Sequence, residues 1–214
     1  MLNLNLPSLI TGIITLVIAF TVHEFAHAWT ADQLGDDTPR FNGRLTLNPL
    51  AHLDPWGSLL LLFAGFGWAK PVPVNPDSLR RRTPAGMMLV SAAGPFANLL
   101  LAIVVALPFK AGLLDPSFFS ISPILPSLPF LLTQFIRINL LLLFFNLIPL
   151  SPLDGEKVLE YFLRPSGRDT LYRLKPYSPY ILIALIFFLP YLGIDVIRWL
   201  VFWPADHVFS LLVL

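Results

Sequence analysis

The sequence predicts an all-α polytopic membrane protein, and its composition and apolar runs support this fold class. Of the 214 residues, 56% are hydrophobic and only 13% are charged. The mean hydropathy is +0.72. A typical soluble domain carries about 25% charged residues, so this composition disfavours a water-soluble protein. Several apolar runs also approach the length of about 20 residues that a helix needs to cross a bilayer.

The apolar runs predict a three-helix core followed by one or two C-terminal helices. The expected core helices cover residues 7–31, 85–109 and 128–150, and the C-terminal helices lie within about 177–214, divided near Gly193 to Asp195. We expect a single membrane-embedded domain over residues 1–214, with its core at about 7–160. The chain has no cysteine, which excludes disulfides and thiolate metal ligands.

The connecting segments predict smaller elements beside this core. The run GSLLLLFAGF at 57–66 is too short for a full span, which favours a short re-entrant or interfacial segment. Residues 44–47 are a candidate short strand. Residues 68–76 predict an extended edge strand, because their prolines cannot donate hydrogen bonds at the centre of a sheet. Residues 151–176 predict a basic loop.

The distribution of basic residues predicts an orientation. Residues 32–84 hold six of the 14 lysines and arginines, and residues 151–176 hold five. Since cytoplasmic loops are enriched in Lys and Arg, both regions are expected in the cytoplasm. The first helix then runs inward, the helix at 85–109 outward and the helix at 128–150 inward. We therefore expect a multi-pass cell-membrane protein whose polar site opens towards the cytoplasm.

The stretch TVHEFAHAW, at residues 21–29, places His23, Glu24 and His27 inside an apolar helix. Histidines at i and i+4 project from one helix face and can bind one metal ion. Neutral imidazoles suit zinc, and the intervening glutamate can act as a general base. A pair of helix-interface histidines is the alternative. Ionisable groups within a membrane helix are functional by default, which favours the metal site.

A catalytic zinc needs a third protein ligand and an open position for water. Asp154, in the stretch NLIPLSPLDGEKVL, follows the helix at 128–150 at the expected depth of the histidines. Pro149 and Pro152 interrupt that helix and free backbone groups, which a membrane protein tolerates only beside protein or water. Taken alone, Asp154 before Gly155 predicts an ordinary turn. Its coincidence with the HEFAH motif favours a ligand instead.

Three motifs in this order resemble the site-2 protease family of intramembrane zinc metalloproteases. The motifs are HEFAH at 23–27, AGPFAN at 93–98 and NLIPLSPLDG at 146–155. The stretches NPLAHLDPWG and GWAKPVPVNP between them are similar to the compact prokaryotic branch. The resemblance covers roughly residues 15 to 160 and includes neither a PDZ-like insert nor a nucleotide-sensing domain.

This resemblance implies one zinc ion per chain, bound by His23, His27 and Asp154. It also implies that Glu24 is the general base and that Asn146 holds or polarises the scissile carbonyl. The expected reaction is hydrolysis of peptide bonds in transmembrane or membrane-proximal segments of membrane proteins. The expected fold is a three-helix catalytic core, which agrees with the three apolar runs.

Several weaker assignments remain open between two roles. Asn146 could instead form a helix-interface hydrogen bond. The expected edge strand could clamp an unwound substrate by strand addition or simply connect two helices; its residues are Lys70, Pro71, Val72, Pro73, Val74 and Asn75. Gly94, Pro95 and Asn98 suit helix packing. His52 is an auxiliary group of the site or, more simply, a loop histidine that pairs with Asp54 or caps a backbone turn.

The rival class is a zinc transporter or metal-binding membrane protein without hydrolytic activity. Such a protein would place polar groups along a transmembrane path, whereas this sequence clusters them at one depth. A protease with a glutamate as third ligand is a further alternative, for which only Glu156 and Glu160 remain. Nothing in the sequence predicts a nucleic-acid partner, and the substrate, the trigger, the number of C-terminal spans and the oligomeric state stay open.

Overall fold

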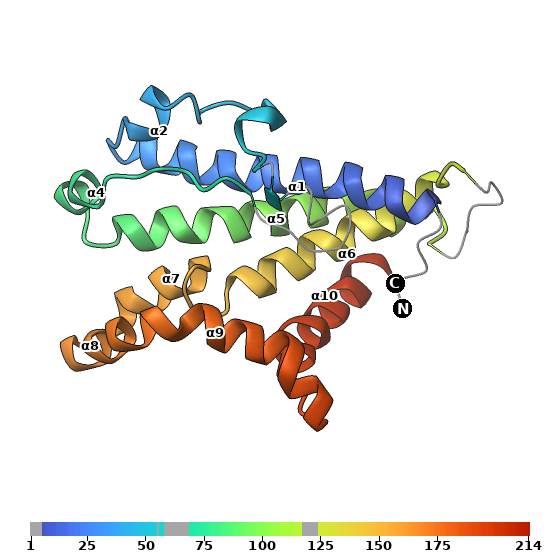
Figure 1. Ribbon diagram of the computed structural model, residues 1–214. Helices are drawn as coiled ribbons and strands as arrows, with labels where there is room; N and C mark the ends of the chain where they lie inside the picture. Colours follow the sequence, from blue (N-terminus) through green and yellow to red (C-terminus); the bar gives the residue numbers. More distant parts are fainter. Residues whose placement is uncertain (1–5, 55, 58–68, 117–123) are drawn as a thin grey trace.

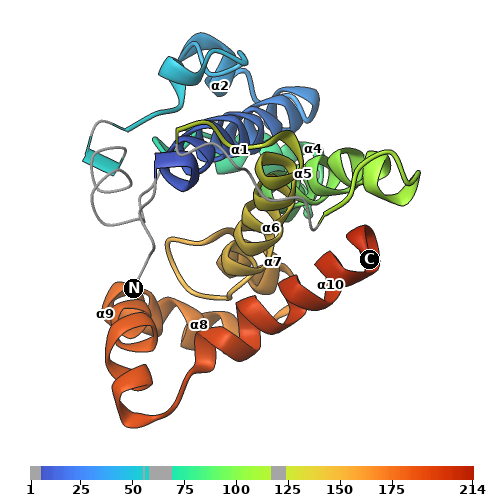
Figure 2. The ribbon, with the colours of Figure 1, turned by 90° about the vertical axis from the view of Figure 1, so that its right-hand side faces the viewer.

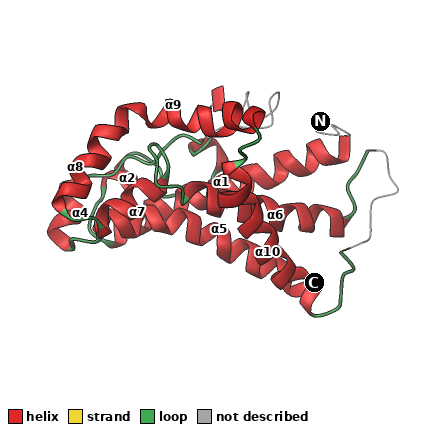
Figure 3. Ribbon diagram, turned by 90° about the horizontal axis from the view of Figure 1, so that it is seen from below, coloured by secondary structure: helices red, strands yellow, loops and turns green. Residues whose placement is uncertain are grey.

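The computed structural model describes residues 6–54, 56–57, 69–116 and 124–214 (Figure 1). Most of these residues are helical, and the described part of the chain contains no named strand (Figure 3). One isolated antiparallel bridge joins Leu53 to Ala69. The predicted all-α class is therefore confirmed, and the expected β element is reduced to this single bridge.

The α-helices have the following bounds: α1 Leu6–Gln33, α2 Thr38–Phe41, α4 Pro76–Arg82, α5 Gly86–Lys110, α6 Leu128–Asn146, α7 Asp154–Phe162, α8 Pro165–Leu174, α9 Ser178–Ile183 and α10 Trp203–Val213. Short 3-10 or π-helical pieces lie at Pro49–Ala51, Lys175–Tyr177, Ala184–Phe188, Leu189–Leu192 and Arg198–Phe202. Four described segments are long and apolar enough to cross a membrane: α1, α5, α6 and the run Pro165–Leu192.

The three predicted core helices pack together, with α5 in contact with both α1 and α6. Figures 1 and 2 show that α1, α5 and α6 alternate in direction. The main apolar cluster joins α5, α6 and α10 and comprises Ala102, Ala106, Phe109, Ile136, Leu140, Leu143, Ala205, Phe209 and Val213. Small residues on α5 let the helix backbones approach closely, as is usual between membrane helices.

The third core helix ends earlier than the sequence predicts, at Asn146 instead of residue 150. Pro149 has no N–H to continue the helical hydrogen bonds, and it disfavours helical geometry at the residue before it. The chain then turns through residues 147–153 and enters α7 at Asp154. This early end places Asp154 directly beside the core.

The region 151–176 is wrongly predicted as a loop, because it contains α7 and α8. Asp154 and Glu156 lie in the first turn of α7, where negative charge stabilises the helix dipole. Pro165 begins α8, and proline is favoured at a first helical position. Local helix-start signals therefore outweigh the high content of charged residues in this region.

Three smaller predictions have different outcomes. The strand at 44–47 is wrong, because these residues form bends in which the Thr46 N–H donates to the Arg44 carbonyl. The predicted division of the C-terminal helices is confirmed at Gly193, whose φ of 77° ends one helical run. The re-entrant segment at 57–66 lies outside the described residues, apart from Gly57.

Candidate metal centre

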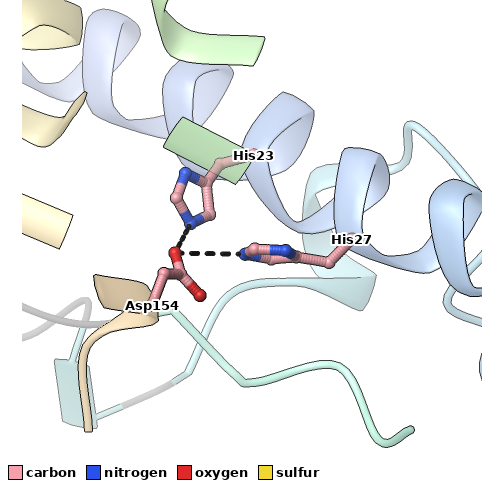
Figure 4. A group of neighbouring side chains, drawn as sticks. All are labelled: His23, His27 and Asp154. Carbon is pink, nitrogen blue, oxygen red and sulfur yellow. Dashed lines mark ion pairs between the residues drawn. The ribbon is translucent and has the colours of Figure 1, made fainter. Parts of the chain in front are cut away.

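His23 and His27 lie on consecutive turns of α1 and face the same side of the helix. Both are buried, and their ring centroids are 4.6 Å apart. Their Nε2 atoms point towards the start of α7 (Figure 4). The i, i+4 spacing therefore produces the shared face that the sequence predicts.

Asp154, the first residue of α7, completes a cluster with the two histidines. Its Oδ2 atom lies 3.2 Å from His23 Nε2 and 3.4 Å from His27 Nε2. A tetrahedral ion with bonds of about 2 Å holds neighbouring ligand atoms about 3.3 Å apart. The spacing and the donor set of two imidazoles and one carboxylate therefore fit zinc. Among the described residues this is the one group of His, Asp and Glu side chains with such geometry.

Hydrogen bonds to the outer ring nitrogens determine which nitrogen of each histidine carries a proton. His23 Nδ1–H donates to Asn98 Oδ1 at 2.6 Å, and His27 Nδ1–H donates to the Val90 carbonyl at 2.7 Å. Because a carbonyl oxygen can only accept, each Nδ1 must be the donor. Both Nε2 lone pairs then face Asp154, which is the tautomer that a metal ligand requires.

Gly94 of α5 lies against both rings. A Cβ atom on Gly94 would stand 2.6 Å from His23 Nε2 and closer still to His27 Nε2. No side chain fits there unless the imidazoles move. The AGPFAN motif, which the sequence assigns to helix packing, thus also leaves room for the metal-facing edges of the rings.

The charge of Asp154 suits a metal ligand. Burial by itself would raise the pKa of this carboxyl, but the positive charge that the His27 and His23 imidazoles carry when protonated holds the pKa well below its usual range. Asp154 is therefore a carboxylate at neutral pH, as metal binding demands. Its side chain is 17% exposed, so the cluster is not sealed from outside.

Glu24 lies beside this cluster on α1 and is 8% exposed. No described residue donates a hydrogen bond to its carboxylate. A general base needs a free lone pair within reach of the proton that it abstracts. Among the described residues nothing occupies the Glu24 carboxylate, so its lone pairs are free.

Asn146 is the last residue of α6 and is half-buried. Its Nδ2 atom donates to the Leu142 carbonyl at 3.0 Å, within its own helix. The alternative bond to a neighbouring helix is not formed among the described residues. One amide N–H of Asn146 remains available, since an amide group carries two.

The segment 70–75, predicted as an edge strand, is fixed at both ends by buried charged residues. At one end, Arg44 donates to the carbonyls of Lys70 and Pro71 at 3.2 and 3.1 Å, and also to the carbonyl of Ala51. At the other end, the Asn75 N–H donates to Asp36 Oδ2 at 2.6 Å.

Within this segment, only Val72 and Val74 have backbone N–H groups between the two anchors. Val72 lies between two prolines and is half-buried. In the described part of the chain, no acceptor binds its N–H. The Val74 N–H likewise has no acceptor among the described residues, so the segment presents two free backbone donors on a fixed support.

The remaining candidates do not join the cluster. His52 is fully buried and donates from Nε2 to the Thr46 carbonyl at 2.7 Å. Of the two loop roles expected for His52, pairing with Asp54 is not formed, because Asp54 accepts from the Gly57 N–H, whereas the bond to the Thr46 carbonyl agrees with the role of capping a backbone turn. The ring of His207 stacks on Trp203.

The two glutamates considered as alternative ligands are held in ion pairs. Glu156 lies 2.9 Å from Lys175 Nζ, and Glu160 lies 2.8 Å from Lys157 Nζ. Tyr172 also donates to Glu160. Burial would raise the pKa of Glu160, but Lys157 and Tyr172 lower it by donating hydrogen bonds. Neither glutamate therefore competes with Asp154.

Two groups near the centre are absent from the predicted site, the Val90 carbonyl and Asn139. A backbone carbonyl leaves no mark in a sequence. Asn139 has one sequence signal, since it is a polar residue within the apolar run of α6. Polar residues inside membrane helices usually bond across helices, and Asn139 accepts from Asn98 Nδ2 at 2.9 Å.

The structure combines apolar helices, an HExxH sequence on one of them and an aspartate from a second segment beside both histidines. This combination is typical of intramembrane zinc metalloproteases. Comparison with known proteins agrees. The model of peptidase family M50 matches residues 11–115. The chain belongs to this family, which comprises the site-2 proteases.

Similar curated proteins have names that describe zinc metalloproteases. YwhC of Bacillus subtilis is 41% identical over 206 residues, covering 90% of this chain and 84% of the relative. Rip2 of Mycolicibacterium smegmatis is 33% identical over 94% of this chain and 76% of the relative. Rip2 of Mycobacterium tuberculosis H37Rv is 34% identical over 84% of this chain and 69% of the relative. No solved structure matches the chain significantly.

These findings make the chain a multi-pass intramembrane zinc metalloprotease. The family acts on membrane proteins, and zinc is its cofactor. A transporter without hydrolytic activity is not favoured.

The close contact of Gly94 with both imidazoles predicts that a methyl group added at this position weakens zinc binding. Gly94→Ala must displace both rings, so we expect zinc affinity to fall about 10- to 100-fold, the range seen when support of metal ligands is lost. Competition with a zinc chelator measures this. Gly12→Ala, on α1 with nothing within 4 Å of the added Cβ, is the control. Equal affinities for the two variants would contradict the proposed contact.

Proposed function

We propose that His23, His27 and Asp154 hold the single zinc ion and that Glu24 is the general base. The observation that carries the proposal is the position of Asp154 Oδ2, 3.2 and 3.4 Å from the Nε2 atoms of both histidines. The histidines belong to the HEFAH motif at 23–27 and Asp154 to the motif at 146–155, which lie far apart in the sequence. We further propose that residues 1–214 act as one membrane-embedded catalytic domain.

Glu24 and Asn146 have different roles in the proposed hydrolysis of a peptide bond. When bound, zinc supplies the Lewis acidity that polarises a peptide carbonyl and activates water. Glu24 takes a proton from the attacking water and passes it to the leaving amine. The free N–H of Asn146 donates to the oxygen on which negative charge develops.

The position of the site in the bundle supports a proposed orientation in the membrane. Helices α2, α4 and α7 lie at the end where α1 finishes and α5 begins (Figure 1). Arg80, Arg81 and Arg82 lie in α4 at this end. Since basic segments favour the cytoplasmic side, we place the opening of the site there.

The substrate is a membrane protein with a transmembrane helix, which must unwind locally to expose a peptide carbonyl. The segment 70–75 can add to an unwound chain as a strand. Two features support this role: Arg44 and Asp36 fix both ends of the segment, and the Val72 N–H is free to pair.

The role of Glu24 predicts a separation between metal binding and activity. Glu24→Gln preserves shape but cannot accept the proton, so we expect cleavage of a single-span substrate to fall by at least about 100-fold. The zinc content, measured by atomic emission, stays at one per chain. Asp154→Asn is the matched comparison, because it changes a proposed ligand and lowers zinc occupancy as well as cleavage. Undiminished cleavage by zinc-loaded Glu24→Gln protein would contradict the assignment.

Strand addition predicts that a change in the segment 70–75 lowers the rate of substrate cleavage and leaves zinc affinity unchanged. Val72→Pro removes the one free N–H between the prolines, so we expect kcat/KM to fall by about fivefold or more, as for the loss of one hydrogen bond. Zinc affinity stays at the wild-type value. Val72→Ile keeps the N–H and serves as the control. If Val72→Pro cleaves as fast as Val72→Ile, the segment is only a connection.

A further inference from the structure

Two fully buried asparagines connect the metal centre to the third core helix. Asn98 on α5 and Asn139 on α6 both have 0% exposure. Asn98 accepts from His23 Nδ1 at 2.6 Å and donates from Nδ2 to Asn139 Oδ1 at 2.9 Å. Asn139 donates in turn to the Phe135 carbonyl of its own helix at 2.9 Å. The three hydrogen bonds form one continuous series across α1, α5 and α6.

The series has a fixed direction because its last group is a backbone carbonyl. The Phe135 carbonyl can only accept, so Asn139 must turn its NH₂ group towards it. The Asn139 oxygen then faces Asn98, which must turn its own NH₂ group towards Asn139. This leaves the Asn98 oxygen facing His23. Reversing either amide would oppose two donors or two acceptors in a buried site, which is costly.

The two histidines are therefore supported in different ways. His27 donates to the Val90 carbonyl, which belongs to the backbone of α5 and cannot rotate. His23 donates to the side-chain amide of Asn98, whose Nδ2 group donates to Asn139 Oδ1 at 2.9 Å and, at 3.5 Å, to the Ala19 carbonyl. Without these acceptors the amide could reverse its oxygen and nitrogen. A reversed Asn98 would present a donor to Nδ1 and favour the tautomer whose Nε2 carries the proton. That tautomer cannot bind a metal through Nε2.

We propose that Asn98 and Asn139 form a positioning relay that fixes the tautomer and ring orientation of His23 for zinc binding. The inference rests on the proposed assignment of His23 as a zinc ligand. Asn98 acts on His23 directly, and Asn139 acts through Asn98 without touching the metal centre. Both are positioning residues rather than catalytic ones.

A purely structural role is the competing explanation, because buried asparagines also hold membrane helices together. The two roles differ in a measurable way. A structural pair lowers stability when either residue is changed, and its effect on zinc follows from general loosening. A relay acts in series, so once Asn98 is removed, the change at Asn139 has no further effect on zinc.

The test measures zinc dissociation constants by chelator competition on the full chain in detergent micelles. For Asn98→Ala and Asn139→Ala we expect affinity to weaken about 10- to 100-fold, as for other residues that orient metal ligands. The double variant weakens no more than the stronger single variant. Thr133→Val is the matched control, since Thr133 is a buried residue of α6 whose hydroxyl, within the part of the chain that the structure describes, bonds only to the Pro129 and Phe130 carbonyls. It keeps wild-type affinity within twofold.

A rescue variant covers the case in which Asn139→Ala folds poorly. Asn139→Thr retains a hydroxyl that can accept from Asn98 and donate to the Phe135 carbonyl, as Thr133 does one turn and a half earlier. We expect it to bind zinc at least threefold more tightly than Asn139→Ala. Equal affinities for these two variants would overturn the relay, as would losses that multiply in the double variant.

His23→Ala separates failure of the relay from failure of the zinc assignment. If His23→Ala binds zinc as tightly as the wild type, the assigned ligand set itself is wrong. If His23→Ala loses zinc while Asn139→Ala retains wild-type affinity, the ligand set stands and the relay is wrong.

Discussion

The approach of one carboxylate to two imidazoles is the interaction on which the rest of the structure depends. Asp154 comes within 3.4 Å of both rings although 126 residues of chain separate it from His27. A charge in a largely buried site is costly unless it is paired, so the surroundings must supply partners. Neutral imidazoles that turn their Nε2 lone pairs towards the carboxylate cannot pair with it, so the positive charge comes from protonation of the rings or from zinc. The neighbouring features either bring these three groups together or fix their orientation.

The end of α6 shows how the backbone brings Asp154 into place. The helix ends at Asn146, and Gly155 packs against the turn that follows: a Cβ there would stand 2.5 Å from the Ile148 carbonyl oxygen. Glycine at 155 thus allows α7 to fold back tightly, with Asp154 at its start. On the opposite side, Gly94 allows α5 to approach the rings. Two glycines on different helices therefore allow α7 and α5 to pack closely around the three side chains of the metal centre.

Local patterns predict much of this arrangement, whereas long-range contacts do not. The HEFAH spacing predicts a shared helix face, because helical periodicity alone determines it. Asp154 can be found only by combining two motifs at one depth. The sequence does not reveal that Asn98 and Asn139 meet, since the pairing depends on how α5 and α6 pack. The strand at 44–47 fails for a different reason: its backbone bonds are local, with the Arg44 N–H donating to the Pro39 carbonyl and the Thr46 N–H to the Arg44 carbonyl.

The most direct test of shared coordination uses the fact that the chain contains no cysteine. Asp154→Cys introduces a single sulfur, and zinc X-ray absorption spectroscopy distinguishes Zn–S at about 2.3 Å from the shorter bonds to nitrogen and oxygen. The account predicts one sulfur neighbour together with imidazole nitrogens in the zinc-loaded variant. Zinc bound at wild-type affinity with only nitrogen and oxygen neighbours would contradict it, because α7 would then contribute nothing to the metal centre.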